Sequence, residues 1–192
     1  MTDFITLLKA QRSYRAFDES VKITKEQLLS MAQCVALCPS SANLQAIKLR
    51  LVRDEKECAE VLSATKWAGY LKNEQIPPVG KAPAAYIIVG VDTEITSNVT
   101  LFYKDTGIVA QSIMLKACEM GFGGCMIGSF DKAALEKALA LPKNFETTLV
   151  LALGKPCEEV QLCPVTDGDT KYFRKNGVHY VPKRSIEEII IK

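Results

Sequence analysis

The chain has 192 residues, of which 48% are hydrophobic and 24% are charged. This length and balance favour one compact domain with a sizeable core, and they exclude collagen-like and disordered chains. The 24 basic and 22 acidic side chains leave a formal net charge of only +2. No global field therefore favours nucleic acid or an anionic membrane as a partner.

The first eight residues lack the basic start, the apolar core and the small-residue cleavage site of a signal peptide. No apolar run approaches the roughly 20 residues that a membrane-spanning helix needs. We therefore expect a cytoplasmic protein that binds no membrane.

Seven cysteines are spread along the chain, most of them inside apolar segments. An odd number in such settings argues against a secreted disulfide framework. Two of them are four residues apart on one helical face, but no second pair or nearby histidine completes a zinc site. We expect reduced, buried thiols that act as small apolar residues, and no bound metal. The cysteines are Cys34, Cys38, Cys58, Cys118, Cys125, Cys157 and Cys163.

Two helices are expected near the start of the chain. Residues 3–11 place apolar side chains on one face, with Thr2 as the cap. Thr24 and Gln27 form the sequence pattern of a capping box. They open a second helix, which ends before Pro39 because proline cannot continue it.

The chain then alternates between strand and helix patterns. Residues 46–53 alternate apolar and basic side chains, which predicts a strand. Asp54 and Glu57 form a second capping-box pattern and open a helix through Ala64. Residues 65–82 carry two prolines and two glycines, so we expect this segment to be irregular.

The second half of the chain contains the most apolar segments. Residues 85–91 form a continuous apolar run, which is typical of a strand buried on both faces. The longest helix is expected over residues 103–120, and a glycine-rich turn leads from it to a short strand at 125–127. A helix over 131–139 and a last core strand over 148–153 follow.

The remainder of the chain from Gly154 is polar until residues 189–191, which predict an edge strand. We find no internal repeat and no linker. The expected architecture is therefore a single α+β domain over residues 1–192.

Two arginines lie at the end of the first expected helix, in the segment Arg12-Ser13-Tyr14-Arg15. Guanidinium groups bind phosphate through paired hydrogen bonds, and Ser13 adds a hydroxyl and a backbone N–H. The same cations also offset the dipole at a helix C-terminus in solvent. The segment is either a phosphate clamp or a solvated helix end.

The loop between the second helix and the first strand is rich in hydrogen-bonding groups. Such a loop suits binding to a planar heterocycle, and it equally suits an ordinary turn. It contains Pro39, Ser40, Ser41, Asn43 and Gln45.

The glycine-rich segment over residues 121–129 is not the dinucleotide-binding fingerprint. Met126 occupies the position of the third glycine, and a strand rather than a helix follows. Its glycines let the backbone approach a flat ligand closely, and they equally serve a helix C-cap and a tight turn. Gly128 and Ser129 end the segment.

The tail offers Lys183 and Arg184 as a second phosphate clamp or as surface charge. Its solitary His179 is expected to be solvated. The sequence shows no Ser/His/Asp set, no paired carboxylates in a motif and no zinc spacing. We infer that a cofactor, rather than a side chain, carries the chemistry.

Four segments, in this order, resemble the FMN-dependent nitroreductase family. The segment Gln11-Arg12-Ser13-Tyr14-Arg15-Ala16-Phe17 is similar to the family's Arg-Arg-Ser-x-Arg-x-Phe, and residues 39–45 are similar to its Pro-Ser-x-x-Asn-x-Gln loop. The stretch from Asp105-Thr106-Gly107 through Gln111, with the glycine turn after it, looks like the central helix. Leu153-Gly154-Lys155-Pro156 looks like the Leu-Gly-x-Pro strand end. The chain departs in Gln11, where many members have arginine, and in Ala46, where proline often follows the loop.

The resemblance implies a mixed central β-sheet flanked by helices, in a homodimer with FMN at the subunit interface. Arg12 and Ser13, with Lys183 or Arg184, would hold the phosphate. Arg15 would lie near the N1–C2=O edge of the flavin ring. Backbone groups of Gly128 and Ser129 would approach N5. The partner chain would supply Pro39, Ser40, Ser41 and Asn43, with Gln45 in the same loop.

The activity implied by the resemblance is ping-pong transfer of electrons from NAD(P)H through FMN to a small oxidised acceptor, such as a nitroaromatic or a quinone. Two alternatives stay open. One is a different flavin reaction on the same fold, such as dehalogenation or ring oxidation. The other is a non-catalytic FMN-binding or redox-sensing protein.

Overall fold

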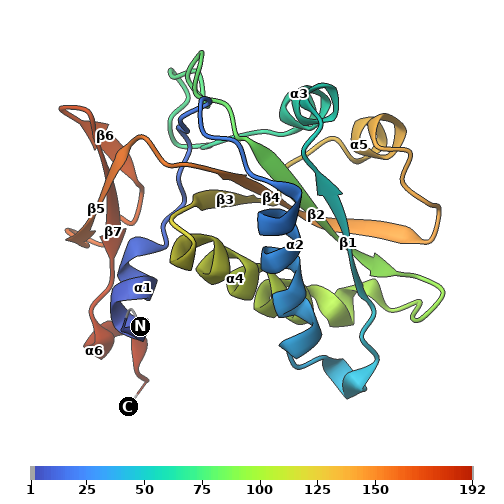
Figure 1. Cartoon of the computed structure of the whole chain (residues 1–192). Helices are drawn as coiled ribbons and strands as arrows, with labels where there is room; N and C mark the ends of the chain where they lie inside the picture. Colours follow the sequence, from blue (N-terminus) through green and yellow to red (C-terminus); the bar gives the residue numbers. More distant parts are fainter. Residues whose placement is uncertain (1–2, 192) are drawn as a thin grey trace.

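A computed structural model describes residues 3–191 of the chain. Its centre is a four-stranded sheet in the order β1-β2-β4-β3, with each neighbouring pair antiparallel (Figure 1). An isolated parallel bridge between Ser13 and Gly124 extends the outer edge beside β3 and makes the sheet mixed there. The strands are β1 Ile47–Val52, β2 Ala85–Asp92, β3 Gly123–Ile127 and β4 Phe145–Gly154.

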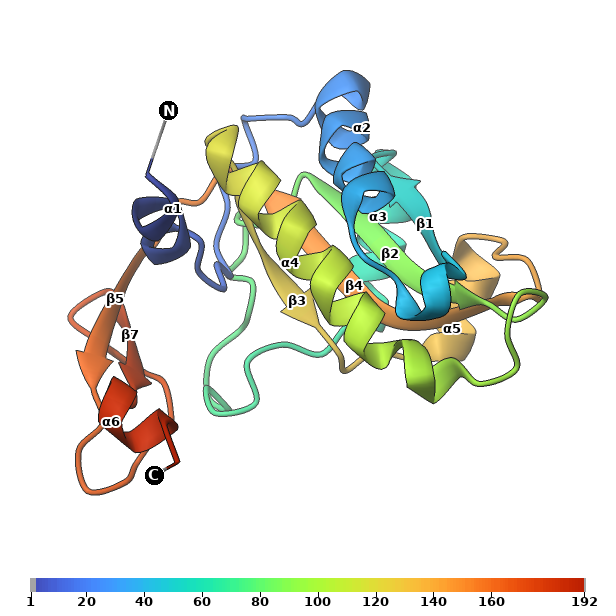
Figure 2. The same cartoon turned by 90° about the horizontal axis from the view of Figure 1, so that it is seen from below.

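Helices cover both faces of this sheet, as the α+β prediction requires (Figures 1 and 2). One face packs against α2 Lys25–Gln33 and α4 Tyr103–Glu119, and the other against α3 Glu55–Ala64 and α5 Lys132–Ala138. Successive side chains of β2 enter the two cores in turn, because a strand alternates its faces. The apolar run at residues 85–91 is therefore buried on both sides, as predicted.

The caps explain where several helices begin. Thr24 and Gln27 form the predicted capping box of α2 in both directions. Asp54 caps α3 by accepting the backbone N–H of Glu57 at 3.1 Å, but the second half of the predicted box is wrong. The Glu57 carboxylate instead accepts a hydrogen bond from Arg50 on β1 at 2.5 Å, because an ion pair across the helix–sheet contact competes for it.

The first helix, α1, spans Phe4–Ala10 and is capped by Asp3, whose carboxylate accepts the backbone N–H of Thr6. Thr2, the cap expected from the sequence, lies outside the described residues. Short 3-10 turns complete the main body: η1 Cys34–Leu37, η2 Ser41–Asn43 and η3 Val99–Phe102.

The tail forms a second sheet, in the order β5-β7-β6, that the sequence did not predict. β5 runs parallel to β7 and β6 runs antiparallel to it. The edge strand expected at residues 189–191 is wrong, because Ser185 opens a short helix with its own capping box to Glu188. We call β5–β7 with this helix the C-terminal unit, and it lies beside α1 (Figures 1 and 2). Its elements are β5 Glu159–Pro164, β6 Phe173–Lys175, β7 Val178–Lys183 and α6 Ile186–Ile189.

The glycine turn after α4 serves the fold directly. Gly121 has a φ of +78°, which ends the helix in the left-handed region that favours glycine. A Cβ on Gly124 would lie 2.0 Å from the carbonyl oxygen of Ala152 on β4, so only glycine fits there. None of the helices over residues 3–191 is long and apolar enough to cross a membrane.

Candidate functional site

The central helix α4 separates the two main groups of expected site residues. The loop at residues 39–45 is bound to Asp105, in the first turn of α4. The Arg12–Arg15 segment lies beside Gly124, just beyond the other end of the helix. A helix of 17 residues is about 25 Å long at 1.5 Å per residue. Gln11, next to Arg12, contacts Gln111 in the middle of α4 at 3.4 Å. Within residues 3–191, no hydrogen bond or ion pair joins the loop to the Arg12–Arg15 segment.

Asp105 anchors the loop through three hydrogen bonds. Its carboxylate accepts the Ser40 hydroxyl at 2.9 Å, and it accepts the Ser41 backbone N–H and hydroxyl at 2.7 Å each. The side chain is almost fully buried, at 2% exposure. Burial opposes ionisation, but the hydrogen bonds from Ser41 and Ser40 outweigh it and hold the pKa of Asp105 below its usual value. An ionised Asp105 thus fixes the loop.

The loop backbone is held in an uncommon conformation. Ala42, Asn43 and Gln45 have φ values of 49°, 54° and 52°, in the left-handed region that residues with a Cβ rarely adopt. The Gln45 backbone N–H donates to the Ser40 hydroxyl at 3.0 Å. A cavity of about 560 Å³ beside the loop is lined by Pro39, Asn43 and Gln45 among others. The loop presents preorganised polar groups to this space.

Arg12 contacts the end of α1 and keeps one buried donor without a partner among residues 3–191. One terminal nitrogen, Nη2, donates to the carbonyl oxygen of Leu8 at 2.6 Å and so satisfies the end of α1. Its Nε is buried and has no partner among the described residues. Ser13, next in the chain, forms the backbone bridge to Gly124.

Arg15 is buried, at 8% exposure, and its guanidinium is held from several sides. Its Nη1 lies 3.1 Å from the Ser13 carbonyl oxygen and 3.1 Å from Nε2 of His179. The guanidinium carbon lies 4.7 Å from the centre of the Tyr172 ring, which is cation–π distance. Its Nε is buried without a partner among residues 3–191. The site therefore contains a fixed positive charge with an unused donor.

His179 is not solvated, and that expectation is wrong. The C-terminal unit packs the ring against Arg15, which leaves 1% of the residue exposed. Burial, followed by the charges of Arg15 and Arg174, lowers the pKa of His179 to about 4. The ring is therefore neutral at ordinary pH. No local sequence pattern predicts this contact, because it depends on a second sheet that was not expected.

Glu158 fixes the backbone of the same segment. Its carboxylate accepts the backbone N–H groups of Arg15 and Ala16. Its other oxygen pairs with Arg174 at 2.7 Å, and Arg174 also pairs with Glu74 at 2.8 Å. The irregular segment at residues 65–82, the C-terminal unit and the Arg15 backbone are thus joined by one ionic network.

Gly128 and Ser129 follow β3 and are exposed. A Cβ on Gly128 would meet nothing within 4 Å, so open space lies beside it. The carbonyl oxygen of Ser129 accepts the backbone N–H of Lys66 at 2.9 Å. This contact brings the start of the irregular segment, including Trp67, next to the end of β3.

Lys183 and Arg184 lie at the exposed end of β7. Arg184 pairs with Glu188 on α6 at 3.3 Å. Within the described chain, no hydrogen bond or ion pair joins either residue to Arg12. The structure therefore leaves these two cations as surface charge in one subunit.

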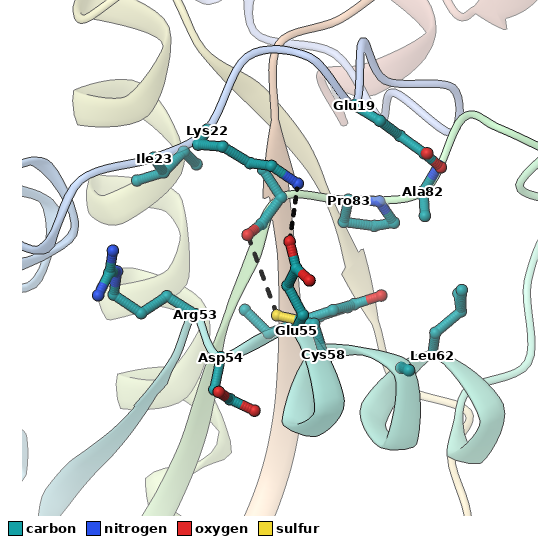
Figure 3. Close-up of a pocket in the computed structure, with 13 residues that line it drawn as sticks. Glu19, Lys22, Ile23, Arg53, Asp54, Glu55, Cys58, Leu62, Ala82 and Pro83 are labelled. Atoms are coloured by element: carbon teal, nitrogen blue, oxygen red, sulfur yellow. Dashed lines mark hydrogen bonds and ion pairs between the residues drawn. The ribbon is translucent and has the colours of Figure 1, made fainter.

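A second cavity, of about 630 Å³, lies between the start of α3 and the chain before β2 (Figure 3). Lys22 and Glu55 form an ion pair of 3.5 Å across it. Burial, with smaller effects from neighbouring carboxylates, raises the pKa of the Cys58 thiol to about 11, so the thiol is protonated. None of the residues expected to bind a cofactor lines this cavity.

All seven cysteines are free, but only Cys125 is buried. The expectation of buried thiols is therefore wrong for the other six: five are partly buried and Cys157 is exposed. Over the part of the chain that the structure describes, no group of three or more His, Cys, Asp or Glu side chains is placed to hold a metal ion.

The comparison with protein families decides the identity. The model of the Nitroreductase family matches residues 8–155. The chain belongs to the nitroreductase family. The predicted resemblance is therefore confirmed.

Relatives of this nitroreductase-family chain agree with that assignment. An "NADPH-flavin oxidoreductase" from Vibrio harveyi is 28% identical over 169 residues, which cover 85% of this chain and 70% of the relative. A solved nitroreductase in complex with FMN, from Exiguobacterium sibiricum 255-15, is 21% identical with a TM-score of 0.64, and the match covers 82% of this chain and 90% of that one.

A nitroreductase family protein from Streptococcus pneumoniae TIGR4 matches almost end to end. It covers 99% of this chain and 100% of its own, with a TM-score of 0.69 and 19% identity. The family model ends at residue 155, whereas this structural match continues through the C-terminal unit. The fold of the tail is thus shared with another member of the nitroreductase fold.

The two arginines of this family member fit an anionic, planar cofactor. Arg12 and Arg15 each keep a buried Nε without a protein partner among residues 3–191. A buried donor without a partner is costly, so an acceptor outside the chain is expected there. The phosphate and the carbonyl-bearing ring edge of FMN are acceptors of the right kind.

Proposed function

We propose that this chain is an FMN-dependent NAD(P)H oxidoreductase that reduces a small oxidised acceptor, such as a nitroaromatic or a quinone, by a ping-pong mechanism. The observation that carries the proposal is the buried Arg15 guanidinium, which is fixed by three neighbours and keeps an unpartnered Nε. Family membership, the flavin oxidoreductase relative and the FMN-bound neighbour support the cofactor and the donor.

Each expected site residue has a role in this proposal. When bound, FMN would supply the two-electron chemistry that links the nicotinamide donor to the acceptor. Arg12 and Ser13 hold the phosphate, with Lys183 or Arg184 as added positive charge. The backbone at Gly128, which has open space beside it, and at Ser129 receives the ring.

Arg15 contributes by placing positive charge where the ring gains negative charge on reduction. Two unit charges about 4 Å apart interact by about 4 kcal/mol at an effective dielectric constant of 20. Because Arg15 is already fixed, little reorganisation opposes this stabilisation. The residue therefore raises the potential at which the cofactor accepts electrons.

A second copy of the chain completes the site in this proposal. The loop that Asp105 holds lies at the far end of α4 from Arg15, so the partner supplies Pro39, Ser40, Ser41, Asn43 and Gln45. Large apolar side chains near that end of α4 are exposed, and a homodimer would cover them. They are Leu37, Leu44, Leu101, Tyr103 and Ile108.

The cytoplasmic location stays a prediction.

The test begins with the purified protein. We expect it to be yellow and to release FMN, not FAD, on denaturation. Stopped-flow mixing with NADH and with NADPH should bleach the flavin, and a panel of nitroaromatics and quinones should restore its colour. Stoichiometric FAD, or no flavin after reconstitution, would overturn the cofactor assignment. Flavin that binds but is not reduced by either nucleotide would indicate a binding or sensing protein instead.

A further inference from the structure

The C-terminal unit presents two aromatic side chains to Arg15, and the site roles proposed above use neither of them. Tyr172 lies under the guanidinium at 4.7 Å, and His179 contacts Nη1 at 3.1 Å. The two rings also contact each other, with centroids 5.3 Å apart. Both side chains come from a segment beyond the end of the family model, which stops at residue 155.

The chemistry of the contact fixes the state of His179. A guanidinium has only donors, so Nε2 of His179 must accept and must carry no proton. The ring is then neutral, with its hydrogen on Nδ1. An imidazolium would offer a second donor and a second positive charge to Arg15, and the contact would be lost.

The charges around the ring favour this neutral form. Arg15 faces it from the N-terminal segment, and Arg174 faces it from the neighbouring strand β6. Glu158, from the chain between β4 and β5, is engaged with Arg174 and with the Arg15 backbone. From the side of the irregular segment, the Tyr70 ring lies 5.0 Å from that of Tyr172 and Glu74 pairs with Arg174.

We infer that His179 and Tyr172 are positioning residues that fix the Arg15 guanidinium at the flavin site, so the C-terminal unit takes part in setting the flavin potential. His179 directs one donor, Nη1, by accepting its hydrogen bond, and Tyr172 fixes the plane of the group. Nε is buried without a partner among residues 3–191 and is the donor that this inference assigns to the cofactor. The consequence for the flavin rests on the proposed function, but the arrangement of Arg15 and His179 does not.

The first experiment measures the flavin potential in four variants of the FMN-loaded protein. His179→Leu keeps an apolar side chain in the space but removes the acceptor. Losing the hydrogen bond between Arg15 Nη1 and His179 should weaken binding of reduced flavin about three- to tenfold more than binding of oxidised flavin. The flavin potential should therefore fall. His179→Gln restores an acceptor oxygen and should return the potential toward that of the native protein. Tyr172→Leu should shift the flavin potential in the same direction as His179→Leu.

Tyr180→Leu is the matched control. Tyr180 is next to His179 on β7 but on the opposite face of the strand, where its ring stacks on Phe173 at 5.2 Å. This variant perturbs the C-terminal unit without touching Arg15, so it should leave the potential unchanged. Equal shifts in Tyr180→Leu and His179→Leu would show a general structural effect and overturn the inference.

The second experiment needs no flavin. His179 is the only histidine in the chain, so ¹⁵N-histidine labelling gives a single pair of ring signals. We expect the neutral tautomer with hydrogen on Nδ1, and a titration midpoint well below that of a free histidine. Arg15→Ala should raise the midpoint, because one neighbouring charge is removed. A solvent-like titration, or hydrogen on Nε2, would overturn the contact.

The two proposals fail in different ways. If Arg15→Ala leaves the flavin potential unchanged while the histidine signals are as expected, the proposed role of Arg15 at the flavin is wrong and the packing of His179 stands. If Arg15→Ala lowers the potential and His179→Leu and Tyr172→Leu do not, the positioning role is wrong and the proposed function stands.

Discussion

The carboxylate of Asp105 accepts both the backbone N–H and the hydroxyl of Ser41, each at 2.7 Å. This buried contact ties the loop at residues 39–45 to the first turn of α4. It also supports a loop backbone in which three residues have positive φ.

Asp105→Asn should therefore loosen the loop. The substitution removes a charge and turns one acceptor into a donor that faces hydroxyl groups. We expect a loss of about 1.5–3 kcal/mol in the free energy of unfolding, the range for hydrogen bonds to charged groups, and weaker FMN binding. Urea unfolding and flavin titration measure the two effects. Glu119→Gln, in an exposed ion pair at the other end of α4, should change stability by less than about 0.5 kcal/mol.

The two arginines should differ in what they affect. Arg15→Ala should lower the two-electron potential of bound flavin, because the reduced anion loses its counter-charge. Arg12→Ala should weaken FMN binding about ten- to hundredfold, since a charge-assisted hydrogen bond is worth about 1.5–3 kcal/mol, and leave the potential of bound flavin nearly unchanged. Potentiometric titration beside FMN dissociation constants separates them. Small, equal effects of the two substitutions on the potential and on FMN affinity would show that both arginines have only structural roles near the end of α1.

His179 should make stability depend on pH. Its pKa is about 4 in the folded chain and 6.5 in an unfolded one, so between these values the unfolded chain binds a proton that the native chain does not. Stability should then fall as pH drops from about 6.5 toward 4, by about 1–3 kcal/mol once solvent screening is allowed for. Arg15, Arg174 and Glu158 are the charged groups around the ring.

Urea unfolding from pH 5 to pH 7 checks this dependence. His179→Gln should flatten the slope in that window, because the chain has no other histidine. Carboxylates titrate in both proteins and cancel in the difference. An unchanged slope in His179→Gln would show that the ring is not buried in solution.

Gly124, within β3, and Gly128, just after the strand, should respond differently to substitution by alanine. Gly124→Ala would place a methyl group 2.0 Å from the Ala152 carbonyl oxygen, and overpacking of this kind costs about 1–3 kcal/mol. Gly128→Ala has open space and should leave the unfolding free energy nearly unchanged while lowering FMN affinity. Equal FMN affinity in Gly128→Ala and the native protein would remove Gly128 from the flavin site.

The proposed dimer can be tested at its exposed apolar surface. Sedimentation at micromolar concentration should show one species near twice 21.1 kDa. Leu37, 88% exposed in one chain, would be buried at the interface, so Leu37→Glu should dissociate the dimer and release FMN. Ile95→Glu, at a partly exposed position in the loop after β2, is the control. A stable monomer that retains FMN would contradict the shared site.

Local patterns predicted the main body well. The Thr24–Gln27 capping box and the apolar run of β2 depend on neighbours within a few residues or on burial of one strand. Each of these signals lies in residues that are close together in the sequence, and tertiary packing favours the same local structure. The predicted role of Glu57 in the capping box of α3 is wrong, because Arg50 on β1 competes for its carboxylate.

The tail and the surroundings of Arg15 could not be predicted in the same way. The strands of the tail, β5 to β7, leave many side chains exposed, so they lack the apolar signal of a core strand. The contact between Arg15 and His179 spans 164 positions in the chain, and no local pattern encodes such a pair. One missed feature was readable: Ser185 and Glu188 have the spacing of a capping box.

Arg15 and the loop held by Asp105 lie toward opposite ends of α4, and this has a genetic consequence. In a symmetric dimer each site would take its arginine from one chain and its loop from the other. Arg15→Ala and Asp105→Asn homodimers would then each lack an intact site, but a mixed dimer would contain one native site and one doubly altered site. Random exchange of equal amounts should restore about a quarter of the native sites. Two defective alleles expressed in one cell would complement each other.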